Sequence, residues 1–94
     1  MSTTGGERQV NGTGTLDVRW FAGAAAAAGR EEERVPLPDG ATLGDLVQVL
    51  GARGPALARV LAASSFLVEG VAARPEDRLA PGTTLDVLPP FAGG

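Results

Sequence analysis

Three residue types that often carry protein chemistry are missing from this sequence. It contains no cysteine, which excludes disulfides, thiolate nucleophiles and cysteine-based metal sites. It contains no histidine, so the usual general base near neutral pH and the commonest metal ligand are absent. Lysine is absent too, and all eight basic residues are arginines. We therefore expect no autonomous catalysis, no metal site and no bound cofactor.

Charge and hydropathy exclude further classes of protein. The arginines are scattered from Arg8 to Arg78 without a cluster and the net charge is −3, so nucleic acid is not expected as a partner. No hydrophobic run is long enough to cross a membrane. Residues 1–6 are polar and glycine-rich and lack the basic and apolar regions of a secretory signal. These absences predict a cytoplasmic protein without a membrane partner.

What remains fits one small domain. The chain has 94 residues, of which 44% are apolar, enough for a single modest core. Residues 1–14 are polar and hold four glycines, too little apolar surface to offset the entropy of ordering them, and predict a disordered extension. We expect residues 15–88 to fold and residues 89–94 to form a flexible tail.

The first half of the domain predicts two strands around a short helix. Residues 16–21 alternate between apolar and polar side chains, which is typical of a strand with one buried face. The alanines of residues 23–29, closed by a glycine, predict one or two helical turns. Residues 31–37 predict an edge strand, because an edge tolerates proline. Its acidic start, Glu31 to Glu33, is interpreted as a solvated edge, with docking of a basic partner as the alternative.

The second half opens with a capped helix. Thr42 and Asp45 have the spacing of a capping box, in which the acidic side chain also favours the helix dipole. Apolar side chains at helical spacing form one stripe over residues 43–50, which predicts the main helix with its stripe in the core. Residues 55–61 can add a short helical segment.

Two further stretches complete the predicted sheet. Residues 66–72 indicate a hairpin that turns at Gly70, and residues 84–88 alternate with Leu85 and Val87 on one face. The order of elements favours an α+β fold in which a mixed sheet of four to five strands packs on one main helix.

The end of the chain carries the candidate chemistry. The last strand runs directly into Pro89-Pro90-Phe91-Ala92-Gly93-Gly94. The two prolines end strand pairing and favour a stiff extended lead, because φ is fixed and the N–H is missing. The two glycines have no side chain to obstruct a narrow channel, so the Gly94 carboxylate can be threaded into another protein's active site. The alternative is a frayed terminus that happens to end in glycine.

Three blocks of the sequence, residues 18–22, 42–46 and 85–94, together carry a resemblance to a known family. They resemble the MoaD/ThiS family of ubiquitin-like sulfur carriers, in particular those that serve as small subunits of molybdopterin synthase. The resemblance spans residues 16–94, its last block is the most specific, and it implies a β-grasp fold. It also implies a covalent cycle in which the Gly94 carboxylate is adenylated and then becomes a thiocarboxylate that donates sulfur.

The same resemblance implies the partners. A ubiquitin-activating-like adenylyltransferase would use ATP to activate Gly94, a cysteine desulfurase or rhodanese would supply persulfide sulfur, and the molybdopterin synthase large subunit would receive it. Because a carboxylate becomes a good electrophile only as a mixed anhydride, the catalytic groups for these steps can all belong to the partners. Gly93 and Gly94 are therefore the predicted reactive site.

A docking patch is predicted beside the tail. In the implied fold the first and last strands lie side by side and turn Phe21 and Leu88 outward together with Arg19 and Asp86. We predict that this patch and the tail bind both the activating enzyme and the large subunit. The predicted partner-binding residues are Phe21, Leu88, Pro89, Pro90, Phe91 and Ala92. The alternative is that residues 24–28 cover Phe21 and the tail covers Leu88.

Three other functions share parts of this pattern. A carrier with the same tail chemistry could deliver sulfur to thiamine, cysteine, tRNA or a specialised metabolite. A ubiquitin-like modifier would be joined to other proteins through Gly94, although without lysine it could not form chains through its own side chains. A plain binding module would have an inert tail. The ending at residues 88–94 resembles the molybdopterin type more than the thiamine type.

Overall fold

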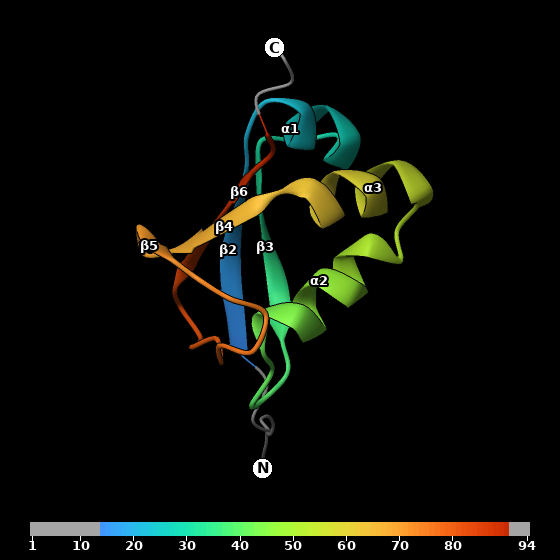
Figure 1. Ribbon diagram of the computed structural model, residues 1–94. Helices are drawn as coiled ribbons and strands as arrows, with labels where there is room; N and C mark the ends of the chain where they lie inside the picture. The colour runs from blue at the N-terminus through green and yellow to red at the C-terminus, as the bar shows by residue number, and fades with distance from the viewer. Residues whose placement is uncertain (1–13, 91–94) are drawn as a thin grey trace.

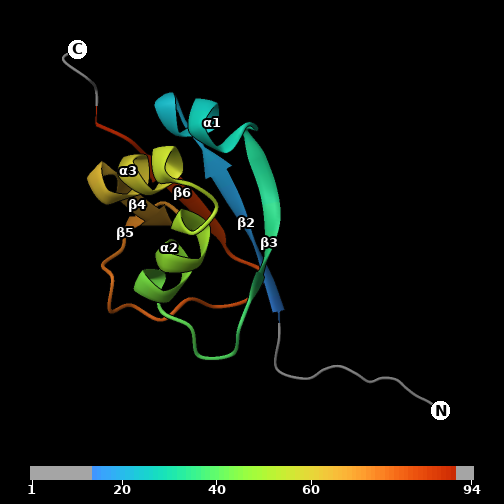
Figure 2. The same cartoon turned by 90° about the vertical axis from the view of Figure 1, so that its right-hand side faces the viewer.

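Five strands and three helices make up residues 14–90, the part of the chain that the structure, a computed structural model, describes. The strands are β2 (Gly14–Trp20), β3 (Glu32–Leu37), β4 (Ser65–Val68), β5 (Val71–Ala72) and β6 (Thr84–Leu88). The helices are α1 (Gly23–Ala28), α2 (Leu43–Gly51) and α3 (Pro55–Ala63). The strands join in one sheet, α2 and α3 lie along one side of it, and α1 lies at one end (Figures 1 and 2).

The two strands at the centre of the sheet come from opposite ends of the domain. The strand order is β3-β2-β6-β4-β5. β2 pairs in parallel with β6, whereas β2 with β3, β6 with β4, and β4 with β5 are antiparallel. The sheet is therefore mixed, as predicted, and residues 67 positions apart, such as Arg19 and Asp86, become neighbours.

The apolar core lies between the sheet and the helices. Leu16, Val18 and Trp20 of β2 are all buried, which confirms the predicted inner face of this strand. Burying each such side chain contributes about 1.5–3 kcal/mol, so the cluster supplies the main driving force for folding. The other large core side chains are Val35 and Leu37 of β3, Leu85 and Val87 of β6, Leu43, Leu46 and Leu50 of α2, and Leu57 and Leu61 of α3.

Local sequence determines where the two longer helices begin. Asp45 N donates to Thr42 Oγ1 (3.1 Å) and Thr42 N donates to Asp45 Oδ2 (3.0 Å), which confirms the capping box at the start of α2. α3 is nine residues long, as long as α2, so two helices share the layer for which the sequence predicted one main helix. α3 begins at Pro55, as predicted, where a missing N–H is tolerated in the first turn, and it continues past the predicted end at residue 61 to Ala63.

Both edges of the sheet follow from local sequence. β3 forms one edge, as predicted. Trp20 N donates to Glu31 O (2.8 Å), so by alternation Pro36 turns its main-chain groups away from β2, where no N–H is needed. At the other edge the β4–β5 hairpin turns at Glu69 and Gly70, which both have positive φ (50° and 80°), as a type I′ hairpin turn requires.

β2 begins at Gly14, two residues before the predicted strand and inside the segment predicted to be disordered. A Cβ on Gly14 would lie 2.6 Å from the Cβ of Pro81, so this close approach requires glycine. The rest of the predicted extension, residues 1–13, and tail residues 91–94 lie outside the described residues. Between residues 14 and 90, no helix has the length and apolar character needed to span a membrane.

Candidate functional site

The candidate site begins where β6 ends and the tail leaves the sheet. β6 ends at Leu88, after which Pro89 is half-buried and Pro90 is exposed. Neither proline has an N–H to donate to a neighbouring strand, so strand pairing stops here. Both prolines line an open apolar hollow whose other walls come from α1 and α3. The remaining predicted tail residues, Phe91, Ala92, Gly93 and Gly94, lie outside the described residues.

Phe21 and Leu88 lie beside each other on the face of the sheet that carries no helix. Phe21 N donates to Val87 O (3.2 Å), which extends the β2–β6 pairing past Trp20. Trp20 and Val87 face the core, so their neighbours Phe21 and Leu88 face away from it. Phe21 is 37% exposed, so α1 does not cover it. The structure thus brings together the two apolar residues of the predicted docking patch.

The ion pair on this face differs from the prediction. Arg19 Nε and Nη2 donate to Asp86 Oδ1 and Oδ2 at 2.8 and 3.3 Å. Asp86 was predicted to be exposed, yet it is only 9% exposed, because β6 lies between β2 and β4 and Arg19 lies against its carboxylate. The hydrogen bond to Asp86 raises the pKa of Arg19 above its ordinary value. The Arg19 guanidinium also lies 5.6 Å from the centroid of the Phe21 ring.

Leu67 belongs to the same face and was not among the predicted site residues. Leu67 of β4 pairs with Asp86, and Ser65 pairs with Leu88, so Leu67 lies on the side of the sheet that Leu88 occupies. The alternation of β4 indicates two faces, but only the β4–β6 register shows which face is shared with Phe21. We use the term open-face patch for Phe21, Leu67 and Leu88 together with the Arg19–Asp86 ion pair.

The acidic run at the start of β3 divides between two environments. Glu31 and Glu32 are exposed, as predicted, whereas the Glu33 side chain is only 9% exposed. Glu33 accepts two hydrogen bonds from Arg53 (2.8 and 3.1 Å) and one from Trp20 Nε1 (2.9 Å). The Arg53 bonds, aided by Trp20 and opposed by burial, hold the pKa of Glu33 below its ordinary value. The interpretation as a solvated edge is therefore wrong for Glu33, which ties β3 to β2 and to the end of α2.

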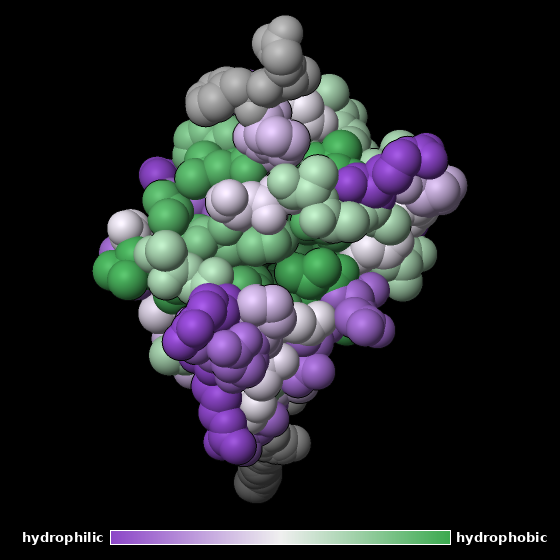
Figure 3. All heavy atoms as spheres, in the orientation of Figure 1, coloured by the Kyte–Doolittle hydropathy of each residue, from purple (hydrophilic) through white to green (hydrophobic). Residues whose placement is uncertain are grey.

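A second apolar surface lies on the side of the molecule that faces the viewer in Figure 1, around β4 and β5. Figure 3 shows apolar residues gathered across the middle of this view. A groove here runs between α2 and strands β4 and β5, and Val47, Phe66, Ala73 and Pro75 are among its lining residues. None of the sequence-predicted site residues lines it. Within residues 14–90, no group of three or more Asp or Glu side chains is arranged to hold a metal ion.

Most of this chain matches a known protein family. The sequence model of the ThiS family matches residues 18–94, from the first strand to the last glycine. The chain belongs to the ThiS family. A relative from Chlamydomonas reinhardtii, described as a molybdopterin synthase sulfur carrier subunit, is 33% identical over 81 residues, covering 84% of this chain and 98% of the relative. These matches confirm the resemblance to MoaD/ThiS sulfur carriers.

Solved structures share the fold. SAMP1 from Haloferax volcanii is 32% identical, with a TM-score of 0.74, over 86% of this chain and 100% of that chain. A putative molybdopterin converting factor subunit 1 from Pyrococcus furiosus is 26% identical, with a TM-score of 0.75, over 83% of this chain and 99% of that chain. With the mixed five-stranded sheet, these neighbours confirm the predicted β-grasp, ubiquitin-like α+β fold.

One structural neighbour was solved as part of a complex. It is a chain of the complex of subunits 1 and 2 of molybdopterin-converting factor from Helicobacter pylori. It is 18% identical, with a TM-score of 0.59, over 85% of this chain and 99% of that chain. At this identity the likeness supports the fold alone.

Proposed function

We propose that this chain is a sulfur carrier whose Gly94 carboxylate is adenylated and converted to a thiocarboxylate, and that it serves as the small subunit of molybdopterin synthase in molybdenum cofactor biosynthesis. The observation that carries the proposal is the family match, which extends to Gly94. The Chlamydomonas relative, described as a carrier subunit of that enzyme, supports the choice of pathway. In this proposal Gly93 and Gly94 are the reactive residues and the protein is a covalent co-substrate of its partners.

The partners catalyse each chemical step of the proposed cycle. A ubiquitin-activating-like adenylyltransferase binds ATP, and the Gly94 carboxylate attacks the α-phosphate and releases pyrophosphate. The terminal sulfur of a persulfide on a cysteine desulfurase or rhodanese then attacks the carbonyl carbon, and AMP leaves. A second donor thiol breaks the resulting acyl disulfide, which leaves the thiocarboxylate on Gly94 and a disulfide on the donor. The large subunit finally receives the sulfur.

Pro89 and Pro90, where the tail begins, and the open-face patch together form the proposed docking surface for the activating enzyme and the large subunit. Pro89 and Pro90 continue a central strand, so the sheet determines where the tail starts. Pro90 and Gly94 can lie up to roughly 14 Å apart. That span lets the carboxylate enter a channel while the patch rests on the partner's surface. Phe91 and Ala92, within the span, complete the proposed partner-binding set.

Intact mass measurement tests the carrier chemistry. The protein is incubated with ATP, an activating enzyme and a persulfide donor, and the expected product has one oxygen replaced by sulfur at its C-terminus. A variant without Gly94 is the matched control and should keep its mass. An unchanged wild-type mass, under conditions that charge a known carrier, would contradict the proposal.

The acceptor pathway needs a separate test, because carriers for thiamine, cysteine, tRNA or specialised metabolites would use the same tail chemistry. A tagged copy of this protein should copurify with a molybdopterin synthase large subunit from its native extract. Copurification with a thiazole synthase instead would retain the carrier chemistry and reject the molybdenum cofactor pathway.

A second candidate function is conjugation to other proteins through Gly94. It is favoured by the likeness to SAMP1 of Haloferax volcanii, a small archaeal modifier protein. Both functions share the adenylation step, after which a modifier forms an amide bond with an amine of a target protein. Adducts of the tagged protein that survive boiling in denaturant and reductant, and that need Gly94, would favour the modifier. A thiocarboxylate without such adducts would favour the carrier.

A further inference from the structure

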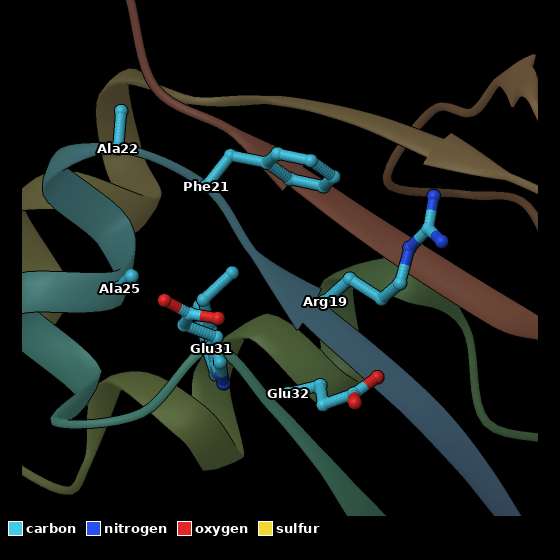
Figure 4. Close-up of a pocket in the computed structure, with 7 residues that line it drawn as sticks. Arg19, Phe21, Ala22, Ala25, Glu31 and Glu32 are labelled. Carbon is cyan, nitrogen blue, oxygen red and sulfur yellow. The ribbon is translucent and has the colours of Figure 1, made fainter.

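A hollow lies where β2 passes into α1, at the border of the open-face patch. Its lining includes Arg19, Phe21, Ala22, Ala25, Glu31 and Glu32. Figure 4 shows Phe21 and Ala22 along one side of the hollow and Glu31 and Glu32 along the other. One side is therefore apolar and the other is acidic.

Ala22, on the apolar side, has a backbone conformation that side chains of L-amino acids avoid. Its φ is 48° and its ψ is −125°. These angles belong to the first central position of a type II′ turn, which glycine normally occupies. Ala24 N closes the turn by donating to Phe21 O (2.9 Å). In a chain with 14 glycines, alanine at this position is the less favourable choice for folding.

Alanine differs from glycine here by a methyl group and by a stiffer turn. Phe21 donates its N–H to Val87 and accepts from Ala24, so both of its main-chain groups are held. The Arg19 guanidinium lies 5.6 Å from the centroid of the Phe21 ring. Phe21 and Ala22 line the hollow together (Figure 4). Strain of this kind persists at sites where the conformation serves function. The methyl group and the fixed ring are therefore candidates for contact with a partner.

The charge of the hollow indicates the chemistry of that contact. Arg19 is paired with Asp86, so its charge is compensated on the patch itself. Glu31 and Glu32 are exposed and form no ion pair with another residue of the range 14–90. An apolar wall facing two carboxylates suits a long basic side chain, whose aliphatic stem packs on carbon while its cation lies near the carboxylates.

We propose that Ala22 is a specificity-determining residue of the open-face patch: its strained turn holds the Phe21 ring and its own methyl group as one wall of the hollow, which receives an arginine or lysine side chain from the protein that takes up the tail. The identity of that protein rests on the proposed function. The stem of the basic side chain packs on Phe21 and Ala22, and its cation lies toward Glu31 and Glu32.

Ala22→Gly separates this role from a purely structural one. Glycine accepts the turn without strain, so the melting temperature should rise by roughly 4 °C. Affinity for the activating enzyme or the large subunit, measured by calorimetry, should nevertheless fall about tenfold, and the ring-current shift of the Arg19 side-chain protons should shrink. Ala52→Gly is the matched control, because it removes the same methyl group from an exposed position that does not line this hollow. It should leave both the affinity and the ring-current shift unchanged.

A charge variant tests the other wall. Glu31→Gln with Glu32→Gln should weaken binding about tenfold and reduce its dependence on salt. Asp39→Asn with Glu76→Gln makes the same charge change in loops that do not line the hollow, and it should leave binding near the wild-type value. Wild-type affinity in Ala22→Gly, or an equal loss of affinity in Ala52→Gly, would overturn the proposal. If the wild type and the variants differ in affinity as expected but no thiocarboxylate forms, the proposed function would be overturned and this inference would stand.

Discussion

At the scale of single residues, Glu33 is a carboxylate that accepts hydrogen bonds from two separate parts of the fold. It receives hydrogen bonds from Arg53 and Trp20, and Arg30 lies 3.7 Å away. A carboxylate taken out of water is unfavourable unless such partners compensate for the lost hydration. Since Trp20 is itself buried, its indole N–H would have no acceptor if the carboxylate were removed. Glu33 therefore holds β2, β3 and the end of α2 together.

The substitution Glu33→Gln should lower the free energy of unfolding by about 1–3 kcal/mol at neutral pH. A neutral amide cannot hold the Arg53 guanidinium in two charge-assisted hydrogen bonds, although it can still accept from Trp20. Urea denaturation measures the difference. Glu76→Gln removes an exposed carboxylate that lies 3.5 Å from Arg74, and it should change stability by less than about 0.5 kcal/mol. Equal losses in the two variants would mean that burial of Glu33 has no energetic role.

The same carboxylate should make stability depend on pH. Its pKa in the folded protein lies below the ordinary value of 4.5, so the unfolded chain takes up a proton first as the pH falls. The contribution of Glu33 is therefore fully present above about pH 4.5 and is lost as the pH falls through the lower folded pKa. Comparing unfolding of wild type and Glu33→Gln from about pH 6 to about pH 3 should show their difference shrinking. A difference that stays constant would reject this linkage.

At the scale of elements, the capping box of α2 is a local contact with a measurable effect. Thr42→Ala removes the acceptor for Asp45 N and should lower the free energy of unfolding by about 1 kcal/mol. The melting temperature should fall by roughly 4–8 °C. Thr42→Ser keeps a hydroxyl at the same place and should retain most of the stability. If both variants melt with the wild type, packing alone holds α2.

The elements themselves were predictable because their causes are local. Periodicity identified the inner face of β2, the capping box identified the start of α2, and Gly29, with φ of 82°, ends α1 as predicted. Strand order was available only through the family resemblance, because pairing of β2 with β6 joins residues far apart in the sequence. The start of α3 at Pro55 was predicted, but its end at Ala63 was not, because Ala62 and Ala63 are exposed and continue no apolar stripe.

The candidate site was predictable to the extent that neighbouring strands place it. The adjacency of Phe21 and Leu88 follows once β2 and β6 are side by side. The burial of Asp86 and the inclusion of Leu67 depend on β4, which pairs with the other side of β6, and the internal role of Glu33 depends on Arg53 beyond the end of α2. No pattern within one segment reports such contacts, so sequence reasoning assigned these residues by alternation alone.

At the scale of the whole molecule, the open-face patch should decide binding. Phe21→Asp with Leu88→Asp should abolish complex formation with the activating enzyme and the large subunit, because charges would replace the apolar contacts at its centre. Both side chains face away from the core, so circular dichroism should show a retained fold. Val49→Asp with Val71→Asp is the matched control, since these valines are 62% and 68% exposed on α2 and β5. Retained binding by the first variant would remove the patch from the docking surface.

The central position of β6 has a mechanical consequence. β6 is bonded to β2 on one side and to β4 on the other, and Pro89 and Pro90 follow directly at its end (Figure 1). A pull on the tail would therefore slide β6 lengthwise past both neighbours and load all their main-chain bonds together, in shear. An edge strand pulled sideways would instead break its main-chain hydrogen bonds one after another. In the proposed cycle, this arrangement would let a partner hold the protein by its C-terminal residues without unfolding the sheet.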